Sequence, residues 1–281
     1  MSKAATNQDI LKPAELAARL SSTIFRDAAN IRHFDAIGST NTSAMQAAVQ
    51  GAAEGSLFIA EEQLTGRGRG GHSWHSEAGS GIYVSMILRP EFDASTVLTL
   101  SLIAGIAVHD AIQNVCGIKP DLRWPNDVLI GTRKVAGILT ETSADMRRIH
   151  HAVIGIGLNV NHAAFPPELA AQATSLKLET GRSWTRLELL VALLESLDDQ
   201  YRALSLDAAA ETQSVIRRFE ERSSFVRETW LAVHERDAAE AQYTGKALGL
   251  DTRGFLRLQT ESGVRTVLNG GIRKVPAMER T

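Results

Sequence analysis

Residues 63–74 read Q-L-T-G-R-G-R-G-G-H-S-W, and this glycine- and arginine-rich segment lies between two predicted strands. The first strand covers residues 56–61 (S-L-F-I-A-E). The second is predicted to be half-buried, because apolar side chains alternate with smaller or polar ones at Ile82, Val84, Met86 and Leu88. Glycine lets backbone N–H groups approach an anion, and arginine adds donors that match phosphate or carboxylate geometry. The segment is therefore predicted to be a loop for a phosphate-bearing ligand, disordered when empty and ordered when filled.

Two common nucleotide-binding patterns do not explain this loop. The glycines formally match G-x-G-x-x-G, but more glycine rather than a helix follows residues 72–75, and no acidic residue ends a second strand about 20 residues on. A P-loop is excluded because Gly-Lys-Ser/Thr does not occur in the chain. A flexible arginine–glycine surface loop, or one that binds nucleic acid, stays open as an alternative.

The composition narrows the class of protein. The chain has 281 residues and a formal net charge of −2, which suits one large domain or a catalytic domain plus a small one, without a global basic surface for DNA or membranes. Its single cysteine, Cys116, excludes an internal disulfide and a cysteine zinc site, and is predicted to be a buried thiol. The N-terminus has no apolar signal region, and no run of apolar residues is expected to be long enough to span a bilayer. We expect a cytoplasmic protein with no membrane partner.

The pattern along the chain predicts three parts. Residues 1–30 form a short N-terminal helical extension, with one helix after Pro13. Residues 31–222 form an α+β domain in which a mixed or antiparallel sheet packs with helices, among them helices at 97–115, 187–204 and 208–222. Residues 223–281 contain short strands and turns, which predicts a small β-barrel packed on the main domain.

Local signals within the α+β domain locate candidate site residues. Ser39 or Thr40 is predicted to cap a helix that Gly51 ends. Two strands are predicted around a hairpin turn at 131–133, with a turn or a bulge at 125–127 before Val128. The strand at 152–161 carries Gly155 and Gly157 at alternate positions, which indicates close approach of a ligand or another backbone to one face.

Four pieces now stand in a recognisable order. They are S-T-N at 39–41, Q-x-x-G-R-G-R at 63–69, W-P-N-D at 124–127 with R-K-V-A-G-I-L at 133–139, and G-I-G-L-N at 155–159. From residue 31 to the end, the chain resembles a biotin–protein ligase. The resemblance implies a class II synthetase-like catalytic domain of the biotin/lipoate ligase fold and an SH3-like C-terminal β-barrel. Because the segment before Ile31 is too short for a DNA-binding winged helix, we expect a monofunctional ligase without repressor activity and without nucleic acid as a partner.

The implied reaction has two steps. Biotin attacks ATP to give biotinyl-5′-AMP, and a lysine of the biotin carboxyl carrier domain of acetyl-CoA carboxylase or a related carboxylase then takes the biotin. ATP and biotin are thus substrates, and Mg²⁺ is expected with ATP near Asn126 and Asp127, without a direct protein cage. Whether the enzyme is a monomer or a homodimer is left open.

The resemblance also implies roles for individual residues. Lys134, Arg67 and Asp127 are the implied catalytic residues, with Asp127 a hypothetical proton acceptor. The implied biotin-binding residues are Ser39, Thr40, Asn41, Gln63, Gly66, Arg67, Gly68, Arg69, Lys134, Gly137 and Gly155. Those implied for ATP and the adenylate are Arg67, Arg69, Trp74, Asn126, Lys134 and Asn159.

Some residues depart from the family pattern. Gly70, Gly71 and His72 follow the second arginine where further basic residues are common, which predicts a looser hold on the adenylate. Arg123 stands where lysine is frequent. The spacing His72-x-x-His75 resembles a metal pair, but it lies in a glycine loop without a third ligand, so no metal site is predicted there.

Three other functions remain alternatives. A lipoate or octanoate ligase or transferase shares the fold, but a linear acyl chain needs no polar cluster like S-T-N with Gln63. A nucleic-acid-binding protein is disfavoured because two arginines neutralise few phosphates. A non-catalytic biotin sensor is disfavoured by Lys134, whose charge suits the bridging of a carboxylate and a phosphate.

Overall fold

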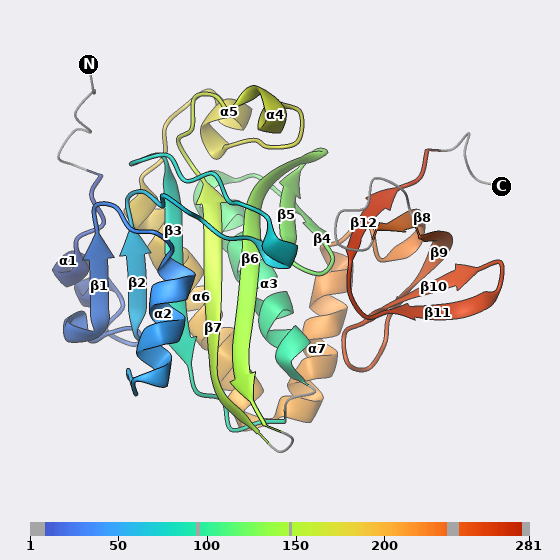
Figure 1. Cartoon of the computed structure of the whole chain (residues 1–281), viewed down its shortest axis with the longest axis horizontal. Coiled ribbons are helices and arrows are strands. Elements are labelled where there is room, and N and C mark those ends of the chain that lie inside the picture. The colour runs from blue at the N-terminus through green and yellow to red at the C-terminus, as the bar shows by residue number, and fades with distance from the viewer. Residues whose placement is uncertain (1–8, 94–95, 146–147, 235–241, 277–281) are drawn as a thin grey trace.

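The computed structural model describes residues 9–93, 96–145, 148–234 and 242–276, and it contains two sheets (Figure 1). The larger sheet has seven strands in the order β1-β2-β3-β7-β6-β5-β4, with β1 and β2 parallel and all other neighbours antiparallel. The smaller is a five-stranded antiparallel sheet in the order β11-β10-β9-β8-β12. The predicted α+β class with a mixed sheet is confirmed.

The strands of the larger sheet are β1 Ile31–Phe34, β2 Leu57–Ala60, β3 Gly81–Leu88, β4 Asp121–Arg123, β5 Asp127–Ile130, β6 Arg133–Ala144 and β7 Ile149–Asn159. Those of the smaller sheet are β8 Arg227–His234, β9 Tyr243–Leu250, β10 Leu256–Thr260, β11 Gly263–Val267 and β12 Gly271–Lys274. The α-helices are α1 Pro13–Arg19, α2 Thr40–Val49, α3 Val97–Cys116, α4 Pro167–Ala170, α5 Leu176–Thr180, α6 Arg186–Leu206 and α7 Ala208–Glu221; short 3₁₀ turns cover Ala28–Asn30 and Arg69–Gly71. The segment at 121–130 thus holds two strands, one more than predicted.

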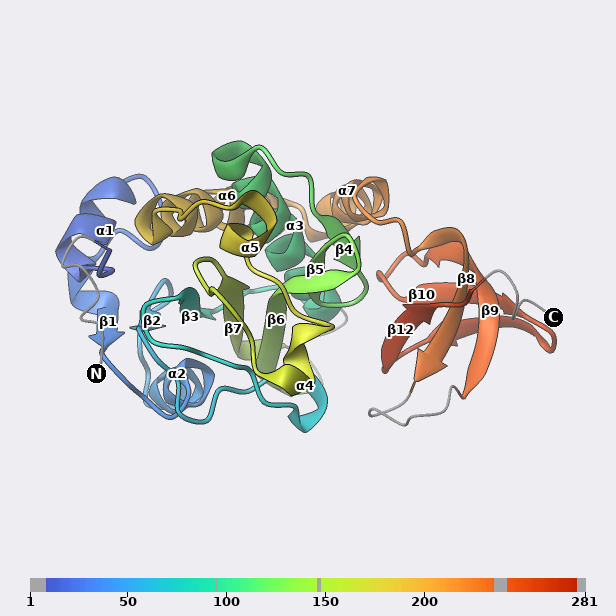
Figure 2. The same ribbon diagram turned by 90° about the horizontal axis from the view of Figure 1, so that it is seen from above.

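Helices cover both faces of the larger sheet (Figure 2). Helix α2 lies on one face, where its alanines pack with Phe58, Ile87 and Val153. Helices α3 and α6 lie on the other, against Ile82 and Val84. Every residue of β3 is therefore buried. The prediction of a half-buried strand is wrong here, because a sheet covered on both faces buries both sets of alternating side chains.

Helix α3 is the central core helix. The helix has 20 residues, and its most apolar window has a mean hydropathy of 1.3. Among the described residues, α3 is the one helix long and apolar enough to cross a membrane. The expectation that no run reaches this length is therefore wrong, yet 67% of the window is buried inside the protein. Cys116, at its end, is half-buried rather than fully buried, and burial raises the pKa of its thiol to about 11. The thiol is accordingly protonated and unreactive at neutral pH.

The C-terminal sheet packs on the larger unit, as predicted. Trp124 Nε1 donates a hydrogen bond of 2.9 Å to the Gly254 carbonyl, and Gly254 lies against Leu98 and Leu102 of α3. Leu256 of β10 belongs to the same apolar cluster as the α3 side chains. Helix α1 also joins this cluster through Leu16 and Ala17, so the described part of the N-terminal extension is packed on the domain. Residues 1–8 and 277–281 of the predicted terminal segments lie outside the described residues.

A buried ion network ties the N-terminal segment to the end of β2. Arg186 is 2% exposed; its guanidinium pairs with Asp9 at 2.9 Å and Glu61 at 2.7 Å, and donates to the Gly81 carbonyl. His33 Nε2 lies 2.9 Å from the other Glu61 oxygen. Burial acts to raise the pKa of Glu61, but the hydrogen bond with His33 and the charge of Arg186 outweigh it, so this pKa lies below its ordinary value.

The replacement Glu61→Gln is predicted to destabilise the fold at neutral pH by about 1–3 kcal/mol, because it removes a counter-ion from the buried Arg186. A carboxyl whose pKa is lowered in the folded state contributes stability that is present above its unfolded pKa and lost as the pH falls through the folded pKa. The measurement is the urea-unfolding free energy between pH 7 and pH 3. It should fall more steeply for the parent than for Glu61→Gln, and the exposed control Glu195→Gln on α6 should follow the parent. Parallel curves for all three proteins would contradict the assigned pKa.

Candidate active site

A pocket lies on the face of the larger sheet where β6 and β7 carry glycine. In the strand register Gly137 pairs with Gly157, while Gly155 pairs with Leu139 on one side and Ser85 on the other. The pocket encloses about 420 Å³, part of it open to solvent. It is lined by Ser39, Thr40, Asn41, Gln63, Arg67, Gly68, Arg69, Trp74, Ser85, Asn126, Lys134, Gly137, Ile138, Leu139, Gly155, Ile156 and Gly157.

The glycines form the floor of this pocket. A Cβ atom on Gly155 would lie 2.4 Å from Asn41 Oδ1, and one on Gly157 would lie 2.3 Å from Trp74 Nε1. A Cβ on Gly137 would lie 2.9 Å from the Lys134 side chain and from the Trp74 ring. The structure thus places two side chains, those of Asn41 and Trp74, against these glycines, and the predicted approach of a ligand or another backbone stays a prediction.

One end of the pocket is a hydrogen-bonded polar cluster. Ser39 caps α2 by accepting from the Thr42 N–H, which places Thr40 and Asn41 in the first turn. The Thr40 N–H and hydroxyl both donate to Gln63 Oε1, at 2.9 and 3.0 Å, and the Ser85 hydroxyl donates to Thr40 Oγ1 at 2.8 Å. These bonds fix the orientation of the Gln63 amide and of the hydroxyls.

Asn41 adds a buried acceptor to this end of the pocket. Its Nδ2 donates to Glu141 Oε2 at 2.5 Å, whereas its Oδ1 has no hydrogen-bond partner among the described residues. A buried amide oxygen without a donor is costly. The pocket thus presents an acceptor able to receive an N–H from a ligand.

The other end of the pocket is charged. Lys134 Nζ lies 2.5 Å from Asp127 Oδ1 and 5.2 Å from the centre of the Trp74 ring, and Arg123 holds the second Asp127 oxygen at 2.6 Å. Burial acts to raise the pKa of Asp127, but the charges of Lys134 and Arg123 outweigh it and lower that pKa. Asp127 is therefore an ionised counter-ion and a weak base in this state. Its predicted role as a proton acceptor stays a prediction.

The glycine–arginine loop closes over the pocket. Gly68 N–H donates to the His72 carbonyl at 2.7 Å, Trp74 N–H donates to the Gly66 carbonyl at 2.8 Å, and Gly70 and Gly71 turn the chain with φ of 73° and 94°. Because side chains rarely adopt these angles, the turn needs glycine at both positions. The predicted ordering of this loop by a ligand stays a prediction.

The two loop arginines have different partners. Arg67 pairs with Glu141 at 3.1 Å, beside the polar cluster. Arg69 donates to the Gly270 carbonyl at 2.9 Å, so the loop also contacts the C-terminal sheet. Arg67 therefore points toward the pocket end that holds Asn41, while Arg69 connects the loop to the second sheet.

The structure gathers most, but not all, of the predicted site residues around one cavity. Gly66 and Asp127 do not line the pocket. Gly66 packs within the loop against Trp74 and Ser76, and Asp127 contacts the pocket only through its ion pair with Lys134. Asn159 also lies outside the lining, where its Nδ2 donates to the Thr174 carbonyl at 3.0 Å. The functional role of each of these residues stays a prediction.

Sequence reasoning missed several residues of the site. Ser85 carried a usable signal, since it is a polar residue inside a run of apolar strand residues. Gly157 had been identified only as a point of close approach. Glu141 and the lining residues Ile138, Leu139 and Ile156 had no local signal, because only the strand order β3-β7-β6 brings them to the pocket.

Comparisons with known proteins agree with this architecture. Residues 34–159 match the Biotin/lipoate A/B protein ligase family, and residues 237–272 match the Biotin protein ligase C terminal domain. The bifunctional ligase/repressor BirA of Bacillus spizizenii is 36% identical over 240 residues, which cover 85% of this chain and 72% of that protein. The biotin–[acetyl-CoA-carboxylase] ligase of Mycobacterium tuberculosis is 36% identical over 179 residues, covering 61% of this chain and 65% of that enzyme.

A solved structure extends the similarity to the whole fold. The biotin protein ligase from Aquifex aeolicus in complex with biotin and ATP aligns with a TM-score of 0.74 and 28% identity, covering 88% of this chain and 99% of that one. The chain belongs to the biotin/lipoate A/B protein ligase family. Within that family, its C-terminal module is the one found in biotin protein ligases.

The ion cluster at the charged end is predicted to be energetically coupled. Asp127→Asn should lower the unfolding free energy by about 2–4 kcal/mol, because it leaves Lys134 and Arg123 without their counter-ion. Lys134→Met should cost less, since Arg123 still holds Asp127. In the double variant the loss should be smaller than the sum of the single losses by about 1–3 kcal/mol. Urea unfolding of the four proteins measures this coupling, and strictly additive losses would show that the two residues do not interact.

Proposed function

We propose that this protein is a biotin protein ligase, which activates biotin with ATP to biotinyl-5′-AMP and then transfers the biotin to a lysine of a carrier protein. One observation carries the proposal. A single cavity joins a polar cluster and a glycine floor to Lys134 and the glycine–arginine loop, in a chain of the biotin/lipoate ligase family. These elements correspond to the three parts of the first reaction, which are the ring of biotin, its carboxylate and the nucleotide.

The polar end fits the ring system of biotin. The ureido group has two N–H donors and one carbonyl acceptor, and it is fused to an apolar ring. Asn41 Oδ1 is a buried acceptor to which no described residue donates, and the hydroxyls of Ser39 and Thr40 line the same end of the pocket. Gly155 leaves room for the Asn41 side chain to lie against the strand, which holds this acceptor at the floor of the pocket. A lipoyl or octanoyl chain would leave these polar groups unsatisfied, which disfavours such acids.

The charged end fits the reacting groups. In the first step a biotin carboxylate oxygen attacks the α-phosphorus of ATP, and the bond to the leaving pyrophosphate breaks. Two anions must meet, and the ammonium of Lys134 can lie between them and stabilise the charge of the transition state. The Trp74 indole covers Gly157, and its buried Nε1 has no partner among the described residues, so this side of the pocket offers a ring face and a donor to the nucleotide.

Magnesium is expected with the nucleotide rather than in a protein cage. The two carboxylates beside the pocket are already paired, Asp127 with Lys134 and Arg123, and Glu141 with Arg67. Asn126 lines the pocket and provides an amide oxygen, a ligand type that magnesium accepts. The ion would therefore be held chiefly by the phosphates near Asn126 and Asp127, where it neutralises their charge.

The second step requires a protein partner. The amine of a carrier lysine attacks the acyl carbon of the adenylate, AMP leaves, and the amine loses a proton. For Asp127 to take this proton, Lys134 must first turn away toward the phosphate, since Asp127 now holds it. We propose a biotin carboxyl carrier domain as the acceptor. Because the first step consumes ATP, we also propose that the reaction takes place in the cytoplasm.

Lys134→Ala is predicted to lower the rate of biotinyl-5′-AMP formation at least about a thousandfold, because it removes the charge that offsets the two anions. The fold should persist, since Arg123 still pairs with Asp127. Single-turnover formation of the adenylate, followed by mass spectrometry, measures the effect. The control Lys246→Ala alters a lysine on the C-terminal sheet that pairs with Glu228, and should keep the parent rate. A Lys134→Ala rate within tenfold of the parent would refute the assigned role.

Gly155→Ala is predicted to weaken biotin binding about tenfold or more, because the new methyl group would collide with Asn41 Oδ1. Gly105→Ala is the matched control. Its Cβ would meet only Phe219 and Leu122 at 3.8 and 3.9 Å, and alanine is the better helix former. Isothermal titration with biotin measures both affinities. Equal weakening in the two variants, or none in Gly155→Ala, would remove Gly155 from the binding surface.

A further inference from the structure

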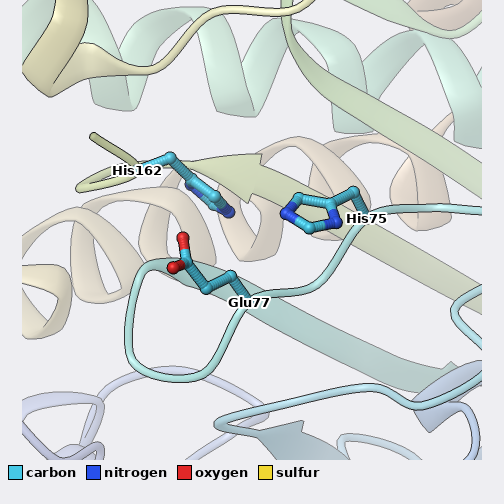
Figure 3. A group of neighbouring side chains, drawn as sticks. All are labelled: His75, Glu77 and His162. Atoms are coloured by element: carbon cyan, nitrogen blue, oxygen red, sulfur yellow. The ribbon is translucent and has the colours of Figure 1, made fainter. Parts of the chain in front are cut away.

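A second polar cluster lies outside the pocket lining, in the part of the chain that joins the loop to β3 (Figure 3). It consists of His75 and Glu77 from that segment and His162, which follows the end of β7. One nitrogen of each imidazole and one Glu77 oxygen lie within 4.8 Å of one another. Figure 3 shows a nitrogen of each ring on the side that faces the other ring, with the Glu77 carboxylate beside His162, and the two ring planes are tilted by 51°. The sequence analysis predicted no metal site at His72 and His75, because it found no third ligand, whereas the structure brings His75 against His162, 87 residues further on.

His162 has an unsatisfied nitrogen. Its side chain is fully buried, and Nδ1 has no hydrogen-bond partner among the described residues. The Tyr83 hydroxyl lies 3.0 Å from the Glu77 carbonyl and 3.1 Å from His162 Nε2. The single Tyr83 hydrogen can satisfy the carbonyl only if Nε2 carries its own hydrogen and donates to the hydroxyl oxygen. The tautomer that satisfies all these groups leaves a bare lone pair on Nδ1, which is costly to bury without a partner.

The surroundings fix this ring and keep it neutral. Phe165 stacks on His162 with centroids 5.0 Å apart and an interplanar angle of 16°, and Ser175 donates to the His162 carbonyl. Burial, together with the nearby His75, lowers the pKa of His162 to about 4. A neutral, oriented imidazole is the form that binds metal ions, and an N–H given to an oxygen acceptor is the usual support of a metal-binding histidine.

The donor set selects a type of metal. Two imidazoles and one carboxylate are ligands of zinc and of related divalent transition metals. Magnesium and calcium prefer oxygen ligands only, and they fit poorly here. No cysteine belongs to the cluster among the described residues, so the site has no sulfur ligand. Glu77 is exposed, which leaves a side of the cluster open to water as a fourth ligand.

We propose that His75, Glu77 and His162 bind one divalent transition-metal ion of the zinc type. Small side-chain movements bring the three donors to bonding distance, and the bound ion clips the segment after Trp74 to the end of β7. The ion thereby restrains the part of the chain that carries the Trp74 indole over Gly157. The proposal does not depend on the ligase reaction, because it rests on side chains that lie outside the pocket lining.

Zinc binding to the full chain, after removal of metals with a chelator, tests the proposal. Isothermal titration with zinc chloride should give one site per chain with a dissociation constant on the order of micromolar or tighter. Addition of cobalt(II) should give the visible absorption of a site with fewer than six ligands. His75→Gln alters a partly exposed position and Glu77→Gln an exposed one, and each should weaken zinc binding about a hundredfold. His162→Gln, at the buried ligand, should weaken zinc binding as well.

His72→Gln is the matched control, because His72 lies in the same segment but outside the cluster. It should bind zinc like the parent, and circular dichroism should show that all variants are folded. Zinc should also slow hydrogen exchange at residues 72–80 in the parent and in His72→Gln, but not in His75→Gln. Binding weaker than about 100 µM in the parent, or equal binding in the parent and His75→Gln, would overturn the proposal.

Discussion

The absence of side chains at three positions of the central sheet determines the shape of the site. Gly137, Gly155 and Gly157 lie on adjoining strands, with Gly137 and Gly157 directly paired. Without this flat patch, Asn41 and Trp74 could not lie against the strands. A methyl group at position 155 would come within 2.4 Å of Asn41, and one at position 157 would come within 2.3 Å of Trp74. The helix cap that places Asn41 and the loop that delivers Trp74 therefore both depend on a backbone surface that only glycine provides.

Charge in the pocket is arranged in pairs. Lys134 shares Asp127 with Arg123, and Arg67 pairs with Glu141. The protein thus keeps these cations neutralised beside the core, in the pocket where we propose that a phosphate and a carboxylate bind. Arg67 and Lys134 can exchange one acidic partner for an anionic ligand, while Arg123 keeps Asp127 in place. This division of roles lets the cations at both ends of the pocket change partners without disturbing the fold around β5 and β6.

Local sequence signals predicted the parts of the site that come from single segments. The serine cap, the hairpin after Gly131, the alternate glycines of β7 and the glycine–arginine loop all follow from patterns of a few residues. Contacts that join distant segments were not predictable in this way. Glu141 reaches Asn41 across 100 residues, and His162 reaches Tyr83 across 79. Such pairs depend on strand order, and the same reason explains why β3 is buried on both faces although its sequence alternates.

The most direct test of the account is ATP–pyrophosphate exchange in the presence of Mg²⁺, with biotin, lipoate, octanoate or no acid. Exchange reports the reversible formation of an acyl adenylate, and so it examines the polar cluster and Lys134 together. The account predicts exchange with biotin alone, because only biotin satisfies the buried acceptor of Asn41 and the hydroxyls beside it. Equal exchange with lipoate or octanoate, or no exchange with any acid, would contradict it.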